Sequence, residues 1–460
     1  MTLEQYQHIH LVGIGGVGMK AIAHVLCQKG FTVSGSDRDA DADLDCLRQD
    51  GAHIFSGHDA ANIDGAEAIV VSTAIPADNP EVVAARKQGI PVFHRSDIVT
   101  ALMNNGLGIA VAGAHGKTTT TSMIGRVCEE ANNQSTIIIG GEVDYLQGNS
   151  KLGDGPYVVA EADESDGSFL KLTPHIAVVT NIEDDHLDYY GSLEHIREAF
   201  LAFVHRLDPR SGLAVICGEN ENNRSLLAKI ERPYVTYGFS DAFDYQATDI
   251  GYTDGKMHFT VKKKGVSLGN ITLRIPGEHN VLNALATVIV GLEIGISFAV
   301  IAAGLADFHG TKRRFQTLLH NDNIWLIDDY AHHPTEIQAT LRAAREVAAN
   351  RLICVFQPHR YTRTQLLQDE FAAAFDAADI LVFTDVYSAG EQPIPGIDGA
   401  LLARLVTERA HNENQEIRYV ADKKELPTYL QDLVHQGDMM IVMGAGDICE
   451  CGYALARQWK

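Results

Sequence analysis

Short runs of apolar, β-branched residues alternate along the whole chain with longer stretches whose apolar positions recur at helical spacing. In the first hundred residues these runs are 10–13, 32–35, 68–72 and 91–93. Short apolar runs separated by helical stretches are typical of parallel strands in an α/β sheet. We therefore predict an N-terminal α/β domain over residues 1–104.

A second series of buried strands begins at residue 105, with the sequences IAVAG, STIII, YVVAEAD and IAVVTN. Between residues 244 and 275 polar and apolar residues alternate instead, and Asp254-Gly255 is the expected hairpin turn. We predict a central α/β domain over residues 105–311 with an antiparallel β patch inside it.

A third series starts near Trp325, where NIWLIDDY, RLICVFQP, DILVFTD, IRYV and MMIVMG alternate with helical stretches. This pattern predicts a C-terminal α/β domain over residues 312–460. A chain of 460 residues also agrees with three domains of roughly 150 residues each.

Composition and charge exclude several classes of protein. The formal net charge of −23 argues against nucleic acid or an anionic membrane as a partner, because both require a basic surface. The chain has no run of about 18 apolar residues, and its N-terminus has no signal-peptide pattern. Its seven cysteines are scattered, as expected for reduced thiols in a cytoplasmic protein. An acidic cluster at 37–45 is predicted to be a solvated loop.

The stretch IAVAGAHGKTTTT at 109–121 has the composition of a phosphate-binding loop. Glycines let backbone N–H groups approach a phosphate, a helix start favours negative charge, and Lys117 neutralises it. Thr118 could reach a magnesium ion. The usual motif has its first glycine where this chain has Val111, so the pattern is the shorter GxxGK[ST] from Gly113. We predict a central domain of the P-loop ATPase type between two Rossmann-like domains.

Polar side chains follow two further strands of the central domain. YVVAEADESDG brings carboxylates to a strand end, and these are Glu161, Asp163, Glu164 and Asp166. IAVVTNIEDDHLDYY does the same with Asn181, Asp185 and His186. Ligands of α/β proteins bind at the carboxyl ends of strands, where oxygen ligands would hold Mg²⁺. An exposed acidic loop would explain the same carboxylates.

Two more motifs suit a nucleotide. The amides in GEHNVLN, with His279, Asn280 and Asn283, can pair with adenine edges, although an asparagine-capped helix start explains them equally well. The GIGGVG at 13–18, with Asp37 about 20 residues on, fits the fingerprint of a diphosphate-bearing ligand. NAD and a nucleotide sugar are both such ligands.

The C-terminal part carries paired basic residues after its strands. Arg360 and Arg363 in FQPHRYTRT could clasp a carboxylate, and Asp329 and His332 follow the preceding strand. A zinc site at the adjacent histidines is unfavourable, because neighbouring side chains point apart. In HGTKRRF a solvated basic turn remains the alternative to a functional role for its arginines.

These motifs, in this order, resemble the Mur ligase family over residues 10 to about 396. The matching strings are GIGGVGM, SGSD, STAI, GAHGKTTTT, EADESDGSFL, TNIEDDHLDYY, GEHNVLNA, GTKRRF, DDYAHHPTE, FQPHRYTRT and VYSAGEQPIPG. One departure is Ala114, where many relatives have threonine, and a small side chain there leaves the backbone phosphate contacts possible.

The resemblance implies a role for each motif. The N-terminal domain would bind a UDP-sugar through Gly15, Gly16, Gly18, Asp37, Ser72 and Thr73. ATP would be bound by Gly113, Ala114, His115, Gly116, Lys117, Thr118, Thr119, His279, Asn280 and Asn283, with Arg314 and Asp329. Mg²⁺, or Mn²⁺ in its place, would be held by Thr118, Glu161 and His186. The incoming amino acid would lie among Tyr330, His332, Arg360 and Arg363. The catalytic residues would be Lys117, Glu161, His186, His332 and Arg314.

The implied reaction joins L-alanine to UDP-N-acetylmuramic acid, at the first step of the peptidoglycan stem peptide. ATP would phosphorylate the lactyl carboxylate, and the amine of alanine would attack the acyl phosphate. Later-acting family members use a carbamoylated lysine downstream of the DH motif, and this chain has no lysine between Lys171 and Lys229. The absence fits the alanine-adding branch. A monomer and a homodimer both remain open.

Three other interpretations compete with this one. A family member that attaches a whole tripeptide shares the N-terminal motifs, although HRYTRT is more similar to the alanine-adding enzymes. An NAD-dependent oxidoreductase explains the glycine fingerprint but leaves GAHGKTTTT without a use. A catalytically inactive nucleotide-binding regulator would not need Lys117, Glu161 and His186 together.

Overall fold

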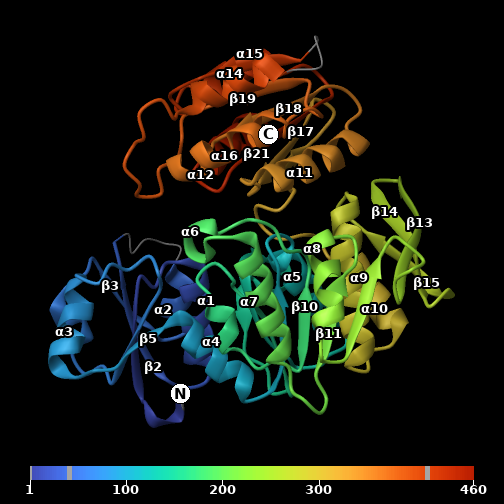
Figure 1. Ribbon diagram of the computed structural model, residues 1–460. Coiled ribbons are helices and arrows are strands. Elements are labelled where there is room, and N and C mark those ends of the chain that lie inside the picture. The colour runs from blue at the N-terminus through green and yellow to red at the C-terminus, as the bar shows by residue number, and fades with distance from the viewer. Residues whose placement is uncertain (1–2, 39–43, 410–414) are drawn as a thin grey trace. The chain divides into compact units, whose positions relative to one another are not determined.

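The computed structural model describes residues 3–38, 44–409 and 415–460, which form three mainly parallel sheets with helices packed against them (Figure 1). This confirms the predicted α/β class. Most of the acidic cluster expected to be a solvated loop, residues 39–43, lies outside the described residues. The predicted domain boundaries, 104/105 and 311/312, stay predictions.

The first sheet has the strand order β3-β2-β1-β4-β5, and all of its pairs are parallel. Its strands are β1 (His8–Val12), β2 (Thr32–Asp37), β3 (His53–Ser56), β4 (Ala68–Val71) and β5 (Val92–His94). Its helices are α1 (Val17–Gln28), α2 (Asp45–Gln49), α3 (Pro80–Gln88) and α4 (Arg95–Asn104). The order reverses beside β1, which places the glycine turn after β1 at the switch point where α/β proteins bind ligands.

The second sheet has ten strands in the order β15-β14-β13-β12-β11-β10-β6-β9-β7-β8. They are β6 (Leu107–Ala112), β7 (Thr136–Val143), β8 (Gly148–Lys151), β9 (Tyr157–Glu161), β10 (Ile176–Val179), β11 (Leu213–Cys217), β12 (Tyr234–Gly238), β13 (Tyr245–Thr253), β14 (Lys256–Lys263) and β15 (Val266–Leu273). The helices are α5 (Lys117–Glu130), α6 (Leu187–Tyr190), α7 (Leu193–His205), α8 (Glu221–Leu226), α9 (Glu278–Glu293) and α10 (Phe298–Ala306). Strand β6 therefore lies between β9 and β10, whose ends carry the acidic motifs.

The predicted antiparallel patch is present as two consecutive hairpins. Asp254 and Gly255 both have positive φ between β13 and β14, so the expected two-residue turn is confirmed. Lys264 and Gly265 repeat this geometry between β14 and β15.

The third sheet has the order β16-β17-β21-β18-β19-β20. Its strands are β16 (Gln316–His320), β17 (Ile324–Asp329), β18 (Leu352–Phe356), β19 (Ile380–Phe383), β20 (Glu416–Tyr419) and β21 (Asp438–Met443). Its helices are α11 (Pro334–Val347), α12 (Tyr361–Leu366), α13 (Gln368–Ala372), α14 (Gly399–Arg409), α15 (Leu426–Leu433) and α16 (Cys449–Gln458).

Alternate residues of β18 pack on opposite faces of this third sheet. Cys354 and Phe356 belong to a cluster with residues of α11, α13 and α14, whereas Ile353 and Val355 pack with residues of α15 and α16. Helices on both faces bury the whole strand, which explains its continuous apolar sequence.

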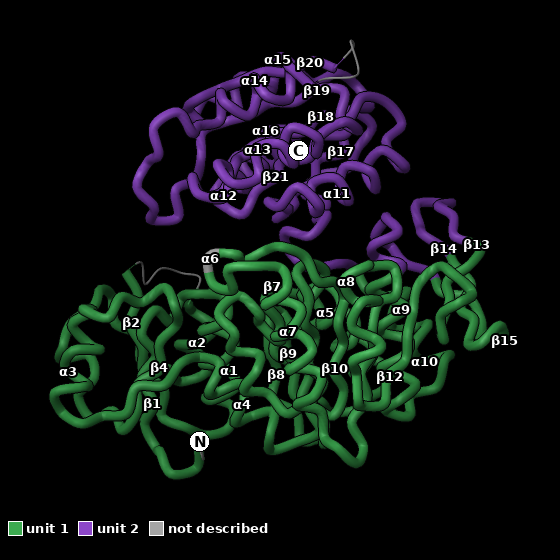
Figure 2. Tube along the Cα trace, viewed as in Figure 1, with its two compact units in different colours: residues 1–249, 259–271, 282–308 green, residues 250–258, 272–281, 309–460 purple. Residues whose placement is uncertain are grey.

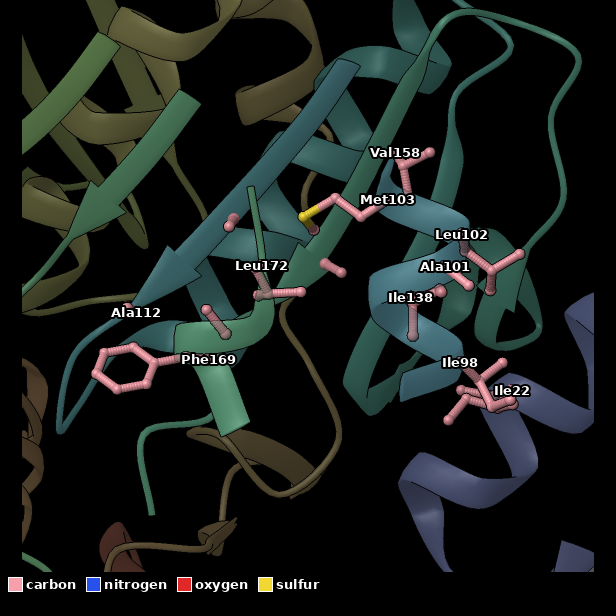
Figure 3. Close-up of a cluster of buried hydrophobic side chains, with 14 of the residues drawn as sticks. Ile22, Ile98, Ala101, Leu102, Met103, Ala112, Ile138, Val158, Phe169 and Leu172 are labelled. Carbon is pink, nitrogen blue, oxygen red and sulfur yellow. The ribbon is translucent and has the colours of Figure 1, made fainter. Parts of the chain in front are cut away.

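The chain divides into two compact units (Figure 2). The first comprises 1–249, 259–271 and 282–308, and the second comprises 250–258, 272–281 and 309–460. Within the first unit a continuous hydrophobic cluster connects the first two sheets. Ile22 of α1 and Ile98 of α4 belong to the same buried cluster as Ile138 of β7 (Figure 3). No helix among the described residues is long and apolar enough to cross a membrane.

Candidate active site

The loop between β6 and α5 has the geometry of a phosphate-binding turn. Gly113 and Gly116 have φ of +136° and +82°, values that favour glycine. A Cβ atom on Gly113 would lie 2.0 Å from Thr180 Oγ1, so no larger residue fits there. Asn181 clamps the loop, since its Oδ1 accepts from the His115 N–H at 2.8 Å and its Nδ2 donates to the His115 carbonyl at 3.0 Å. The turn is thus held in place by residues that directly follow β10.

Lys117 begins α5 and points back into the loop. Its ammonium donates to the carbonyl oxygens of Gly113 at 2.5 Å and Ala114 at 3.2 Å, and to Glu164 Oε1 at 2.6 Å. Burial alone would lower the pKa of Lys117, but the surrounding carboxylates, with Glu164 foremost, outweigh burial and raise it. Lys117 is therefore a fixed positive charge. Thr118 and Thr119 follow it, both buried.

The acidic strand end lies in the same compact unit. β9 ends at Glu161, whose Oε1 accepts from the Gly140 N–H at 2.6 Å. Oε2 of Glu164 is buried and has no hydrogen-bonding partner within the described part of the chain. His186, with φ of +60°, precedes α6, and its Nε2 lies 3.9 Å from Glu164 Oε1. Burial would raise the pKa of Asp163, but the charges of Arg95 and Lys117 and the hydrogen bonds from Ser165 together outweigh it and lower that pKa to about 2.

The residues expected at adenine have partners inside the protein. Asn283 Oδ1 accepts from Thr120 Oγ1 at 3.1 Å. In the second unit, Asn280 Nδ2 donates to the Pro276 carbonyl at 2.7 Å, which ties the start of α9 to the preceding loop. Burial lowers the pKa of His279 to about 4, so its ring is neutral at pH 7. The structure leaves both the adenine and the helix-start interpretations of these amides open.

The glycine turn after β1 borders a cavity of about 990 Å³. Its lining residues are Gly13, Gly15, Gly16, Asp37, Arg38, Leu44, His58, Ser72, Ala74, Ile75, Pro76, Asp78, Asn79 and Pro80. Asp37 Oδ2 accepts from the Gly15 N–H at 2.8 Å, and a Cβ on Gly15 would lie as close to that oxygen. Gly18 lies in the first turn of α1, and a Cβ there would lie 3.0 Å from Arg95 Nη1. Thr73 is exposed in the loop after β4.

In the second unit, a loop with two arginines packs against Tyr330. The guanidinium carbons of Arg313 and Arg314 lie 4.7 and 5.1 Å from the centre of the Tyr330 ring. Arg313 also donates to the carbonyl oxygens of Gly444 and Gly446, whereas Arg314 Nη1 lies 3.6 Å from Glu336. The loop is therefore bound to its own unit, rather than forming a solvated turn.

Asp329 has a structural task in this unit. Its two carboxylate oxygens accept from the backbone N–H groups of Phe315 and Ala331, both at 2.7 Å. Burial raises the pKa of Asp329 to about 6, although Arg314 and these hydrogen bonds oppose the shift. The contacts connect the start of β16 to the end of β17.

His332, His359 and the paired arginines lie together at the carboxyl ends of the third sheet's strands. The rings of His332 and His359 are 5.7 Å apart, and Arg363 Nη1 lies 3.2 Å from His359 Nδ1. Burial lowers the pKa of His359 to about 3, with further lowering by His332, Arg363 and Arg360. Burial likewise lowers the pKa of His332 to about 4. The two neutral imidazoles can accept hydrogen bonds, and the guanidinium groups beside them can bind a carboxylate.

Models of known protein families match three successive parts of the chain. Models described as "Mur ligase family, catalytic domain", "Mur ligase middle domain" and "Mur ligase, glutamate ligase domain" match residues 8–106, 111–291 and 313–446. A UDP-N-acetylmuramate–L-alanine ligase of Pelotomaculum thermopropionicum is 47% identical over 100% of this chain and 99% of its own. The chain belongs to the Mur ligase family.

Solved structures show the same Mur ligase fold. A UDP-N-acetylmuramate-alanine ligase from Thermotoga maritima is 32% identical with a TM-score of 0.84, and covers 98% of this chain and 99% of its own. A murein peptide ligase from Psychrobacter arcticus, at 24% identity and a TM-score of 0.72 over 98% of both chains, shares the fold. The predicted family membership is thus confirmed.

Sequence analysis of this Mur ligase missed several residues that hold the site. Glu164 and Asn181 stood in the acidic motifs, but nothing in the sequence identified them as partners of Lys117 and His115. His359 lies beside the expected arginine pair, and its place next to Arg360 in QPHRY was the available signal. Glu81, buried behind the N-terminal cavity, had no motif at all.

Proposed function

We propose that the protein is an ATP-dependent ligase that joins L-alanine to the lactyl carboxylate of UDP-N-acetylmuramic acid and releases ADP and phosphate. The observation that carries the proposal is the β6–α5 turn, in which Lys117 is held beside an acidic strand end. Likeness over the whole chain to ligases of that name supports the choice of substrates. The reaction would be the first step in building the peptidoglycan stem peptide.

A carboxylate is a poor acyl donor, so it must be activated before an amine can displace an oxygen from it. We propose that the γ-phosphoryl group of ATP passes to the lactyl carboxylate. Lys117 and the N–H groups of the turn would offset the charge that accumulates on the transferring group. The amine of alanine then attacks the acyl phosphate, and phosphate leaves from the tetrahedral intermediate. Gly113, Ala114, His115, Gly116, Thr118 and Thr119 would surround the ATP phosphates.

The residues at this edge fit a magnesium ion. Hydroxyl and carboxylate oxygens are the ligands Mg²⁺ prefers, and the partnerless Oε2 of Glu164 marks a place where positive charge is favourable. We propose that Thr118, Glu161 and His186 hold it. When bound, Mg²⁺ would neutralise charge on the phosphates of ATP. His279, Asn280 and Asn283 are proposed to face adenine, and Arg314 and Asp329 to complete the ATP site.

The two other substrates are assigned to the N- and C-terminal domains. The 990 Å³ cavity with Gly15, Gly16, Asp37 and Ser72 has room for a UDP-sugar, and Gly18 and Thr73 are also proposed to contact that ligand. Tyr330, His332, Arg360 and Arg363 are proposed to bind alanine. His332 Nδ1 donates to the Tyr330 carbonyl at 3.0 Å, which leaves Nε2 as an acceptor for the amino group. The seven free cysteines support a cytoplasmic location.

Phosphate release distinguishes this function from its alternatives. The ligase should release phosphate only when ATP, UDP-N-acetylmuramic acid and an amino acid are all present. A panel of alanine, glycine, serine and the tripeptide separates the alanine-adding ligase from the tripeptide-attaching one. An oxidoreductase would release none, and a regulator would bind ATP without turnover. Hydroxylamine should trap the acyl phosphate as a hydroxamate, and a folded, magnesium-loaded enzyme that never forms one would overturn the proposal.

A further inference from the structure

A buried hydrogen-bond network centred on Glu81 lies behind the N-terminal cavity. Glu81 is fully buried at the start of α3. Its Oε1 accepts from Asn62 Nδ2 at 2.6 Å, and its Oε2 accepts from Ser36 Oγ at 2.7 Å. The same Oε2 lies 3.1 Å from Nδ1 of His58, whose side chain is 16% exposed and lines the cavity. A buried carboxylate is costly unless it is hydrogen-bonded, and both oxygens of Glu81 have partners.

The network fixes the position of the proton on His58. Ser36 Oγ uses its hydrogen for Glu81, so towards His58 Nδ1, at 2.9 Å, it can only accept. Burial would raise the pKa of Glu81, but His10, whose Nε2 lies 3.7 Å from Oε1, and the hydrogen bonds from Ser36 and Asn62 outweigh it and lower the pKa to about 2. Glu81 is therefore also an acceptor. Because both neighbours of Nδ1 are acceptors, Nδ1 must carry the hydrogen.

In a neutral imidazole the other nitrogen then has only a lone pair. Nε2 of His58 has no hydrogen-bonding partner among the described residues, and the side chain borders the cavity. The ring therefore offers a fixed acceptor to a ligand there. A ligand with an N–H group in the plane of its ring can donate a hydrogen bond to this nitrogen.

The order of the sheet indicates which part of a nucleotide would meet His58. In sheets of this kind the diphosphate lies over the first helix start, the ribose near the acidic residue that ends the second strand, and the base beyond it. Here those elements are Gly15 and Asp37, with β3 beyond β2. His58 follows β3 by two residues and lines the same cavity as Asp37.

We infer that His58 selects uracil by accepting its N3–H, and that Glu81 is the positioning residue that keeps His58 in the required tautomer. The inference rests on the proposed UDP-sugar substrate and assigns the base recognition in it. Uracil carries a hydrogen on N3, whereas N3 of cytosine is an acceptor. A fixed acceptor on the protein binds the first and repels the second.

Calorimetric titration of the whole protein with UDP, CDP and N3-methyl-UDP tests this selection without turnover. Wild type should bind UDP at least about tenfold more tightly than either analogue, as expected for one good hydrogen bond. His58→Ala should weaken UDP to the level of CDP. Glu81→Gln, whose amide can donate to Nδ1, should reduce the ratio of UDP to CDP affinity about tenfold. The matched control Glu67→Gln changes an exposed carboxylate of the same domain and should leave the ratio unchanged.

The ¹⁵N signals of the His58 ring provide a readout that a purely structural role would not move. Wild type should show a protonated Nδ1 and an unprotonated Nε2, and Glu81→Gln should shift this distribution. Equal losses of UDP and CDP affinity in Glu81→Gln, or a protonated Nε2 in neutral wild-type His58, would overturn the inference. If Glu81→Gln does not fold, His58→Ala and the wild-type spectrum still decide. A wild type that releases phosphate with UDP-N-acetylmuramic acid yet fails these tests would refute the base recognition alone.

Discussion

The flexible ammonium group of Lys117 is held by three hydrogen bonds within the protein. Two carbonyl oxygens of the turn and one carboxylate bind it. Little rotamer freedom is then left to lose if a phosphate binds there. This fixed position suits the role in phosphoryl transfer that we propose for Lys117.

We predict that Lys117→Ala lowers kcat by a factor of about 10²–10³ or more, because a fixed charge on the transferring group is lost. UDP-N-acetylmuramic acid should still bind, since its proposed cavity is formed by other residues. Steady-state kinetics and calorimetry measure the two effects. The control is Lys151→Ala, at a partly exposed lysine paired with Glu129. Lost sugar affinity with unchanged ATP affinity would reverse the assignment of the domains.

The arginine pair leads to a second prediction. Arg360→Ala should raise the KM for alanine at least about tenfold and leave the KM for ATP within about twofold, because a guanidinium binds a carboxylate through charge-assisted hydrogen bonds. Initial rates with each substrate varied in turn give both constants. Arg404→Ala, at an exposed arginine of α14, is the control. Equal increases in both constants would contradict the carboxylate role.

At the scale of elements, the β6–α5 turn depends on a backbone that only glycine adopts. Gly113→Ala should lower the free energy of unfolding by about 3 kcal/mol, since the new methyl group would collide with Thr180 Oγ1 in addition to the strain of a positive φ. ATP affinity should fall with it. Urea unfolding and nucleotide titration measure the two losses.

The control for this prediction is Gly255→Ala in the β13–β14 hairpin. Gly255 also has a positive φ, +72°, but no atom lies within 4 Å of the added Cβ. Only the backbone strain remains, so the loss should be about 1 kcal/mol and ATP binding should be unchanged. Similar losses at both glycines would show that crowding by Thr180 contributes nothing.

Most of the strands were predictable, either as short apolar runs or, between residues 244 and 275, as an alternation of polar and apolar residues, whereas β3, β8, β11, β12 and β16 were not predicted. IAVAG and IAVVTN became β6 and β10, and Asp254-Gly255 became the predicted turn. The neighbours of each strand were not predictable. β6 pairs with β9 and β10, which come later in the chain. The sequence does not show this pairing, because parallel strands that are buried on both faces have similar apolar sequences.

At the scale of the whole molecule, buried neutral histidines make the protein sensitive to acid. Burial lowers the pKa of His279, His332 and His359 to about 4, 4 and 3, from an ordinary value of 6.5. At these three histidines the unfolded chain therefore binds more protons than the folded one below pH 6.5. Their contribution to stability is full above that pH and decreases as the pH falls towards 4.

We predict that wild type loses about 2 kcal/mol of unfolding free energy between pH 7.5 and pH 5 through His332 alone, given its pKa of about 4. His332→Asn should remove that part of the loss. Urea unfolding at both pH values measures it. His53→Asn, at an exposed histidine of β3, should keep the wild-type difference. If the difference in unfolding free energy between pH 7.5 and pH 5 is the same in His332→Asn as in wild type, then His332 is protonated at pH 5 in the folded protein as well.

The sequence by itself determined the α/β class, most of the strands, the glycine turn before Lys117 and the family, because these depend on local spacing and on motifs contiguous in the chain. It also placed Lys117 and the acidic strand ends. Only the tertiary structure decided that Glu164 holds Lys117, that Glu81 holds His58, and that Ile22 and Ile138 share one core. Such partners are far apart in the sequence, and their contacts arise only when strands are ordered and faces are buried. The spacing of residues along the chain therefore does not show which of these partners come into contact.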